Sequence, residues 1–146
     1  MESITRFVDA ITNIHPPHAT AVHFPIALTA AALLFLLLAL WRQDDTLEQA
    51  AFFNITLAAI SAALAGLTGY RDHVVRFESQ TPYVNVKIYL AVSLLVLTSA
   101  LAISRWRRSK VLWNPDTMLL YVAGFVGSLA LASALGFTGG AIIYGW

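Results

Sequence analysis

Histidine is the residue type that most directly suggests chemistry in this sequence, and it is unevenly distributed. Three of the four histidines, His15, His18 and His23, lie within nine residues of one another, and the fourth is His73. The chain has no cysteine, which excludes disulfides, thiolate zinc sites, iron–sulfur clusters and covalent c-type haem attachment. A metal or haem held by this chain must therefore use histidine, methionine or oxygen ligands.

The segment around the clustered histidines has a geometry that could bring them together. Two prolines separate His15 from His18, and they favour a polyproline II conformation with three residues per turn. These two histidines then project from the same side and could share a ligand. His23 lies deeper, near the start of an apolar stretch, and Pro25 is compatible with the first turn of a helix there.

The fourth histidine follows the second apolar stretch, and we expect it to emerge on the same side of a membrane as His23. A neutral imidazole can ligate haem iron or copper through one nitrogen while the other donates to an acceptor such as Asp72. Nearby cations could pair with haem propionates. The candidate cofactor-binding residues are the axial ligands His23 and His73, with His15 or His18 as alternates, and the cations Arg71, Arg76 and Lys87.

Two other interpretations of these side chains are open. One is a copper or other metal site, which suits imidazole ligands but lacks a recognised spacing; its candidate ligands are His15, His18, His23 and His73. The other is that each histidine is an interfacial side chain bonded to a loop carbonyl. For Lys87 the corresponding alternative is an ammonium that extends to the lipid head groups.

The composition predicts a membrane protein. Of the 146 residues, 58% are hydrophobic and 12% charged, against about 25% charged in an ordinary soluble domain. Each of four apolar stretches supplies the ~20 residues that cross a bilayer. The sequence therefore predicts an all-α, integral-membrane four-helix bundle, a single membrane domain over residues 1–146 with spans at about 19–41, 50–70, 83–103 and 117–144. The formal charge of +1 indicates no nucleic-acid partner.

The N-terminus shows an amphipathic pattern rather than a cleaved signal peptide, so we interpret it as mature sequence. The pattern predicts a short helix over residues 1–15 that lies in the membrane interface or packs on a partner subunit. One face carries the apolar residues Ile4, Phe7, Val8, Ile11 and Ile14.

The distribution of Lys and Arg predicts the orientation in the membrane. The segment of residues 104–110 between the third and fourth stretches carries four positive charges, and Arg42 adds a fifth on the same side. The positive-inside rule places this side in the cytoplasm. Both termini and residues 71–82 then lie on the outer side.

Small residues recur every four positions on two of the predicted helices. They are Gly124, Ser128, Ala132, Gly136 and Gly140 on the fourth, and Ala58, Ala62 and Gly66 on the second. Such stripes allow helix backbones to approach closely. Alternatively, they accommodate a flat cofactor between facing helices, in which case we expect a flat cavity beside Gly66, Gly69 or Gly136.

Several motifs resemble those of a bacterial family of four-helix inner-membrane proteins of unknown function. They are His23-Phe24-Pro25, the run of residues 69–73, Lys87-Ile88, residues 135–140 and Tyr144-Gly145. The resemblance covers nearly the whole chain from His15 onward. It implies a multi-pass protein of the bacterial inner (cytoplasmic) membrane with both termini periplasmic. Because members occur joined to, or encoded near, Rieske and c-type cytochrome modules, it also implies electron transfer outside that membrane.

The chain departs from that family at two positions. Many members have a His-Pro pair five residues before the His-Phe-Pro histidine, where this chain has His18 followed by Ala19, and the pair is found instead at His15-Pro16. Many also have a histidine near the start of the third helix, where this chain has Lys87. The second departure weakens the case for a haem ligand on the third helix.

The sequence contains no glycine-rich phosphate loop, no paired intramembrane carboxylates and no nucleophile elbow. We therefore expect a subunit rather than an independent enzyme. The first hypothesis is a small integral-membrane subunit of a respiratory or photosynthetic electron-transfer complex. It would bind b-type haem near the outer face and contact other subunits, such as a periplasmic cytochrome or Rieske protein. The second is a non-catalytic accessory subunit without a cofactor, and a copper or other metal site ranks last.

Overall fold

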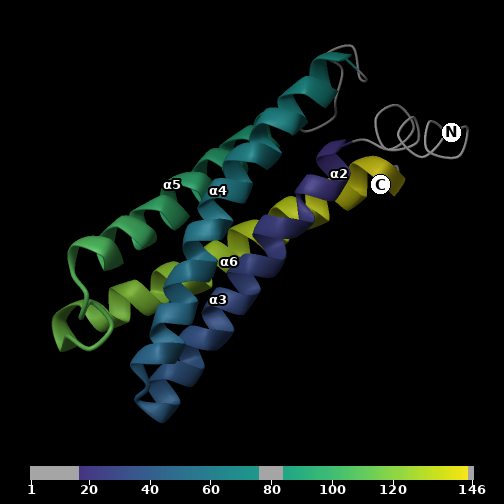
Figure 1. Ribbon diagram of the computed structural model, residues 1–146. Helices are drawn as coiled ribbons and strands as arrows, with labels where there is room; N and C mark the ends of the chain where they lie inside the picture. The colour runs from purple at the N-terminus through teal and green to yellow at the C-terminus, as the bar shows by residue number, and fades with distance from the viewer. Residues whose placement is uncertain (1–16, 76–83, 145–146) are drawn as a thin grey trace, which may run out of the picture.

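The computed structural model describes residues 17–75 and 84–144. The predicted interfacial helix over residues 1–15 lies outside the described residues. The described chain forms one short and four long helices (Figure 1), and these confirm the predicted all-α four-helix architecture. They are α2 (Pro17–Ala21), α3 (His23–Arg42), α4 (Asp45–Val75), α5 (Val84–Arg107) and α6 (Pro115–Tyr144).

The four long helices form an up-and-down bundle. Each packs on the next one along the chain, and α6 closes the ring by packing on α3, while α2 packs on α4 and α3. Short connections favour antiparallel neighbours, and residues 43–44 alone link α3 to α4. We call the end formed by residues 41–48 and 104–117 the arginine-rich end. The opposite end, formed by residues 17–23, 70–75, 84–89 and 136–144, is the histidine end.

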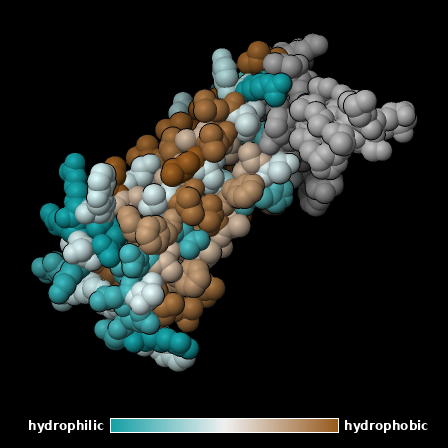
Figure 2. Space-filling view, in the orientation of Figure 1, coloured by the Kyte–Doolittle hydropathy of each residue, from teal (hydrophilic) through white to brown (hydrophobic). Residues whose placement is uncertain are grey.

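All four long helices are long and apolar enough to cross a bilayer. Figure 2 shows a hydrophobic band over the middle of the bundle and hydrophilic side chains gathered at the arginine-rich end. Large apolar side chains such as Leu57 and Ile60 on α4 and Val96 on α5 are exposed. Because water would not tolerate so wide an apolar surface, the chain is a multi-pass membrane protein.

The core of the bundle lies toward the arginine-rich end. Its fully buried members come from all four long helices and from the connection between α5 and α6, and they include Leu36, Ile55, Leu112 and Phe125. Toward the histidine end, a Cβ added at Gly66, Gly139 or Gly140 would meet no atom of the described residues within 4 Å, whereas Gly69 and Gly136 are in close contact with His18 and Ile26.

Part of the predicted small-residue stripe makes close helix contact. A Cβ added at Gly124 would lie 2.6 Å from Leu101 Cδ2, so the absence of a side chain lets α5 approach α6. Ser128 and Ala132, further along the same face, are fully buried, as is Ala58 on α4. The stripe thus serves packing from Gly124 to Ala132.

The buried hydroxyl groups in the middle of the bundle are bonded within their own helices. Thr29 donates to the carbonyl of Pro25 at 2.8 Å, and Thr98 donates to that of Leu94 at the same distance. Ser128 donates to its own helix in the same manner. This pattern satisfies a hydroxyl without a partner on another helix, which supports the interpretation of the interior as packing rather than a polar path.

The turn between α3 and α4 determines where α4 begins. Gln43 adopts a left-handed conformation with φ of 53° and ends α3. The Asp44 carboxylate then accepts hydrogen bonds from the backbone N–H groups of Thr46 at 2.7 Å and Leu47 at 3.4 Å, which caps α4. These bonds, that of Thr46 first, hold the pKa of Asp44 below its ordinary value of 3.8. Helix α4 therefore starts at Asp45, five residues before the predicted span.

Candidate functional site

The arginine-rich end contains a buried ion pair between α4 and α5. Arg105 Nε donates to Glu48 Oε1 at 2.5 Å, and Arg105 Nη2 donates to Glu48 Oε2 at 2.7 Å. Glu48 is 1% exposed and the Arg105 side chain 19% exposed. Two parallel bonds of this kind join a guanidinium to a carboxylate in the geometry that gives the strongest charge-assisted pairs.

Both charges of the pair lie where their own helices favour them. Glu48 is in the first turn of α4, and Arg105 is near the C-terminal end of α5. A helix N-terminus stabilises an anion and a C-terminus a cation. The guanidinium also lies 5.6 Å from the ring centroid of Phe52. Because an unpaired buried charge is very unfavourable, each partner makes the burial of the other tolerable.

This pair was not predicted from the sequence. The predicted spans end at residue 103 and begin at residue 50, which placed Arg105 in a loop and left Glu48 outside any helix. In the structure α5 continues to Arg107 and α4 begins at Asp45. A signal for Glu48 was present, because Ala51 and Ile55 follow it at positions i+3 and i+7 and continue one buried face.

Tyr121 on α6 completes the surroundings of the pair. It is 3% exposed and packs edge to face on Phe125, with 5.0 Å between ring centroids. Its hydroxyl has no hydrogen-bond partner among the described residues but lies within electrostatic range of Glu48 and Arg105. The arrangement pairs opposite charges and presents no nucleophile, so its role is to hold helices together. We call the Glu48–Arg105 ion pair between α4 and α5 the clasp.

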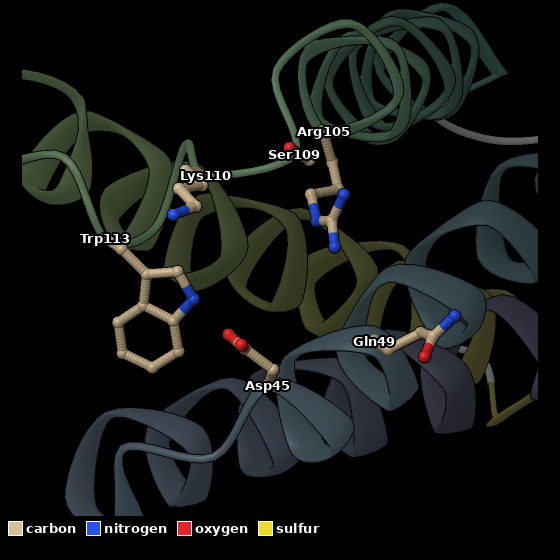
Figure 3. Close-up of a pocket in the computed structure, with 6 residues that line it drawn as sticks. All are labelled: Asp45, Gln49, Arg105, Ser109, Lys110 and Trp113. Carbon is tan, nitrogen blue, oxygen red and sulfur yellow. The ribbon is translucent and has the colours of Figure 1, made fainter.

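An open pocket of about 250 Å³ lies beside the clasp (Figure 3). It is enclosed by the first turns of α4, the C-terminal part of α5 and the connection between α5 and α6. Its lining carries charges of both signs and consists of Asp45, Gln49, Arg105, Ser109, Lys110 and Trp113.

At the histidine end, His18 is held against α4. Its Nδ1 lies 2.9 Å from the carbonyl oxygen of Ala65. A carbonyl can only accept, so Nδ1 carries the proton, and in the neutral ring Nε2 carries the lone pair. A Cβ added at Gly69 would lie 2.8 Å from His18 Cε1. Gly69 therefore provides the space in which the imidazole packs on the backbone of α4.

The other predicted site residues lie at the same end. His23 is exposed as the first residue of α3, and His73 is half-buried in the last turn of α4. Arg71 is exposed on α4, and Lys87 is half-buried near the start of α5. His15 and Arg76 lie outside the described residues. Within residues 17–75 and 84–144, no three His, Asp or Glu side chains converge as metal ligands, and a haem shared by His23 and His73 stays a prediction.

The space beside Gly66, Gly69 and Gly136 shows whether the predicted flat cavity is present there. The space at Gly69 is filled by the His18 ring, and a Cβ added at Gly136 would lie 3.2 Å from Ile26 Cδ1. A haem therefore does not fit between the helices at these two positions. Gly66 is exposed and has no neighbour within 4 Å. It lies seven residues before His73, two turns away on the same side of α4, so the outer surface of this helix is open at Gly66.

Comparison with known protein families gives a match over most of the chain. Residues 14–145 match the model of a family described as "Predicted membrane protein (DUF2231)". The searches of curated proteins and of solved structures found no match.

Replacement of Glu48 by leucine should destabilise the bundle strongly. Removing one partner of a buried ion pair usually costs about 3–5 kcal/mol. Because Arg105 is partly exposed, we expect the Glu48→Leu variant to lose about 2–4 kcal/mol of unfolding free energy. The double variant Glu48→Leu/Arg105→Met should recover at least half of that loss. The measurement is unfolding in mixed detergent with increasing dodecyl sulfate.

The control for these Glu48 and Arg105 variants is Arg107→Met, which removes an exposed arginine from the same end of α5. It should change the unfolding free energy by less than about 0.5 kcal/mol. A Glu48→Leu variant as stable as this control would contradict the role of the clasp.

Replacement of Gly69 by alanine should displace His18 from α4. The added methyl group would overlap the imidazole, and overpacking of this kind costs about 1–3 kcal/mol. Gly66→Ala, one turn earlier on the same helix, meets no neighbour and should be neutral or slightly stabilising. In a His18→Ala background, Gly69→Ala should lose its effect in the same detergent assay. Equal effects of Gly69→Ala with and without His18 would show that the imidazole does not pack there.

Proposed function

Because the chain belongs to the DUF2231 family of predicted membrane proteins, we propose that it is a small integral-membrane subunit of an electron-transfer complex. The observation that carries the proposal is the gathering of His18, His23 and His73 at one end of the bundle. An imidazole near hydrocarbon is uncommon and usually functional. Three of them at one end of the bundle favour a site for a redox group or a redox partner.

The orientation of His18 supports this proposal. A backbone carbonyl that accepts one N–H of a histidine fixes the orientation of the ring, and metal-ligating imidazoles are commonly oriented in this way. The bond from His18 Nδ1 to the Ala65 carbonyl is of this type. His73 lies one turn beyond Gly69, on which the His18 ring packs. The His18 ring from α2 therefore packs on α4 about one turn before His73.

The residues that would hold a b-type haem come from the ends of α3, α4 and α5 at the histidine end. His23 and His73 are proposed to bind its iron, beside the open surface at Gly66. Arg71 and Lys87 are the proposed cations for its propionates, with Arg76 as a third. A bound haem would supply one-electron redox chemistry there. A copper site of His15, His18, His23 and His73 is the lower-ranked form of the same proposal.

The proposed orientation in the membrane follows from the distribution of Lys and Arg. Five Lys and Arg residues at the arginine-rich end support a cytoplasmic position for that end. The histidine end and both termini would then face the periplasm of a bacterial inner membrane. A periplasmic cytochrome or Rieske protein is the proposed partner on that side.

A second candidate function is that of an accessory subunit without its own cofactor. It is favoured by the His18 ring, which fills the space at Gly69 and completes the packing of α2 on α4. In this function the histidine end would serve only as the docking surface for a partner.

The two functions are distinguished by a dithionite-reduced minus oxidised spectrum of the chain purified in detergent. If the chain holds haem, we expect a b-type α-band that disappears in His73→Ala and in His23→Ala. Gly66→Leu should also abolish the band, because its side chain would occupy the surface proposed for the haem. Gly139→Leu is the control, since this glycine on α6 also has no neighbour within 4 Å but lies outside the proposed site. A folded chain with a featureless spectrum would refute the haem site and leave the accessory function.

A further inference from the structure

The pocket at the arginine-rich end is part of a larger polar surface. A second open pocket of about 340 Å³ adjoins it and shares Asp45, Lys110 and Trp113 as lining residues. Figure 3 shows the Asp45 carboxylate and the Trp113 indole nitrogen turned toward each other, with the amino group of Lys110 nearby and the Arg105 guanidinium on the α5 side. Donors and an acceptor therefore line the same pocket.

The depth of this pocket in the membrane is indicated by tryptophan. Trp41 and Trp106 are 76% and 81% exposed at the same end of the bundle, and Trp113 lines the pocket itself. Tryptophan rings prefer the level of the lipid head groups. The hydrophobic band of Figure 2 also gives way to polar side chains here. The molecules most concentrated at this depth are phospholipid head groups.

Two charged groups that line the pocket have no salt bridge within the part of the chain that the structure describes. Within residues 17–75 and 84–144, neither the Lys110 ammonium nor the Asp45 carboxylate has an ion-pair partner. Arg105 is different, because Glu48 binds Nε and Nη2 and leaves Nη1 as a donor. The clasp thereby fixes the guanidinium in place on one wall of the pocket.

This set of groups matches one class of head group. Lys110, the Ser109 hydroxyl and Arg105 Nη1 are donors suited to a phosphate. Asp45 is suited to a primary ammonium. A glycerol head group would leave Asp45 without a partner, and a choline head group has no N–H to donate. We propose that this pocket binds the head group of a phosphatidylethanolamine lipid, with the phosphate near Lys110 and the ammonium at Asp45.

The test is native mass spectrometry of the detergent-solubilised chain titrated with defined lipids of equal acyl chains. Phosphatidylethanolamine should bind about fivefold more tightly than phosphatidylcholine or phosphatidylglycerol, as expected for one partly exposed charge-assisted contact. Lys110→Gln should weaken binding of phosphatidylethanolamine by about the same factor. Asp45→Asn should remove the preference for ethanolamine over choline.

Arg108→Gln is the matched control, because Arg108 is an exposed cation of the same connection that does not line the pocket. It should leave the affinity for phosphatidylethanolamine nearly unchanged. Equal affinity for the three lipids, or an equal loss in Arg108→Gln and Lys110→Gln, would overturn the proposal. Free glycerophosphoethanolamine provides a further arm: if it competes as strongly as the lipid, the pocket takes a soluble ligand and the lipid assignment is wrong.

Discussion

A carboxylate can be buried in an apolar bundle only when its charge is paired, and the pairing of Glu48 with Arg105 is the constraint on which the rest of this structure depends. The pair joins the first turn of α4 to the end of α5, so it sets the register of these two helices. The cap at Asp44 starts α4 at the position that brings Glu48 into reach. The closely packed core then surrounds the pair from all four long helices.

The consequence is a molecule with two unlike ends. Close contacts such as that of Gly124 with Leu101 lie in the part of the bundle that the ion pair closes. At the histidine end, Gly66 and Gly139 have no neighbours within 4 Å, while three imidazoles lie on the helices around them. The buried ion pair and the three imidazoles thus lie at opposite ends of the bundle.

Hydropathy predicts the four spans well, because the free energy of placing a residue in hydrocarbon depends mainly on the polarity of its own side chain. It fails at the ends of α4 and α5, since Glu48 and Arg105 are unfavourable singly and tolerated only as a pair. The position of His18 was also beyond prediction. Its contact with Gly69 depends on the rotation of α4 about its axis, which is determined by packing. The small-residue stripes could not distinguish close helix contact from open space. Gly124 on α6 makes a close helix contact, whereas Gly66 on α4 does not.

The proposed role in electron transfer is tested most directly in the native membrane. The chain would be tagged, isolated with mild detergent from the organism that makes it, and examined as an intact assembly by reduced minus oxidised spectroscopy and by electron paramagnetic resonance. The account predicts that a haem or Rieske signal accompanies the chain in stoichiometric amount. A chain that is isolated folded and without any redox-active partner or cofactor would contradict it.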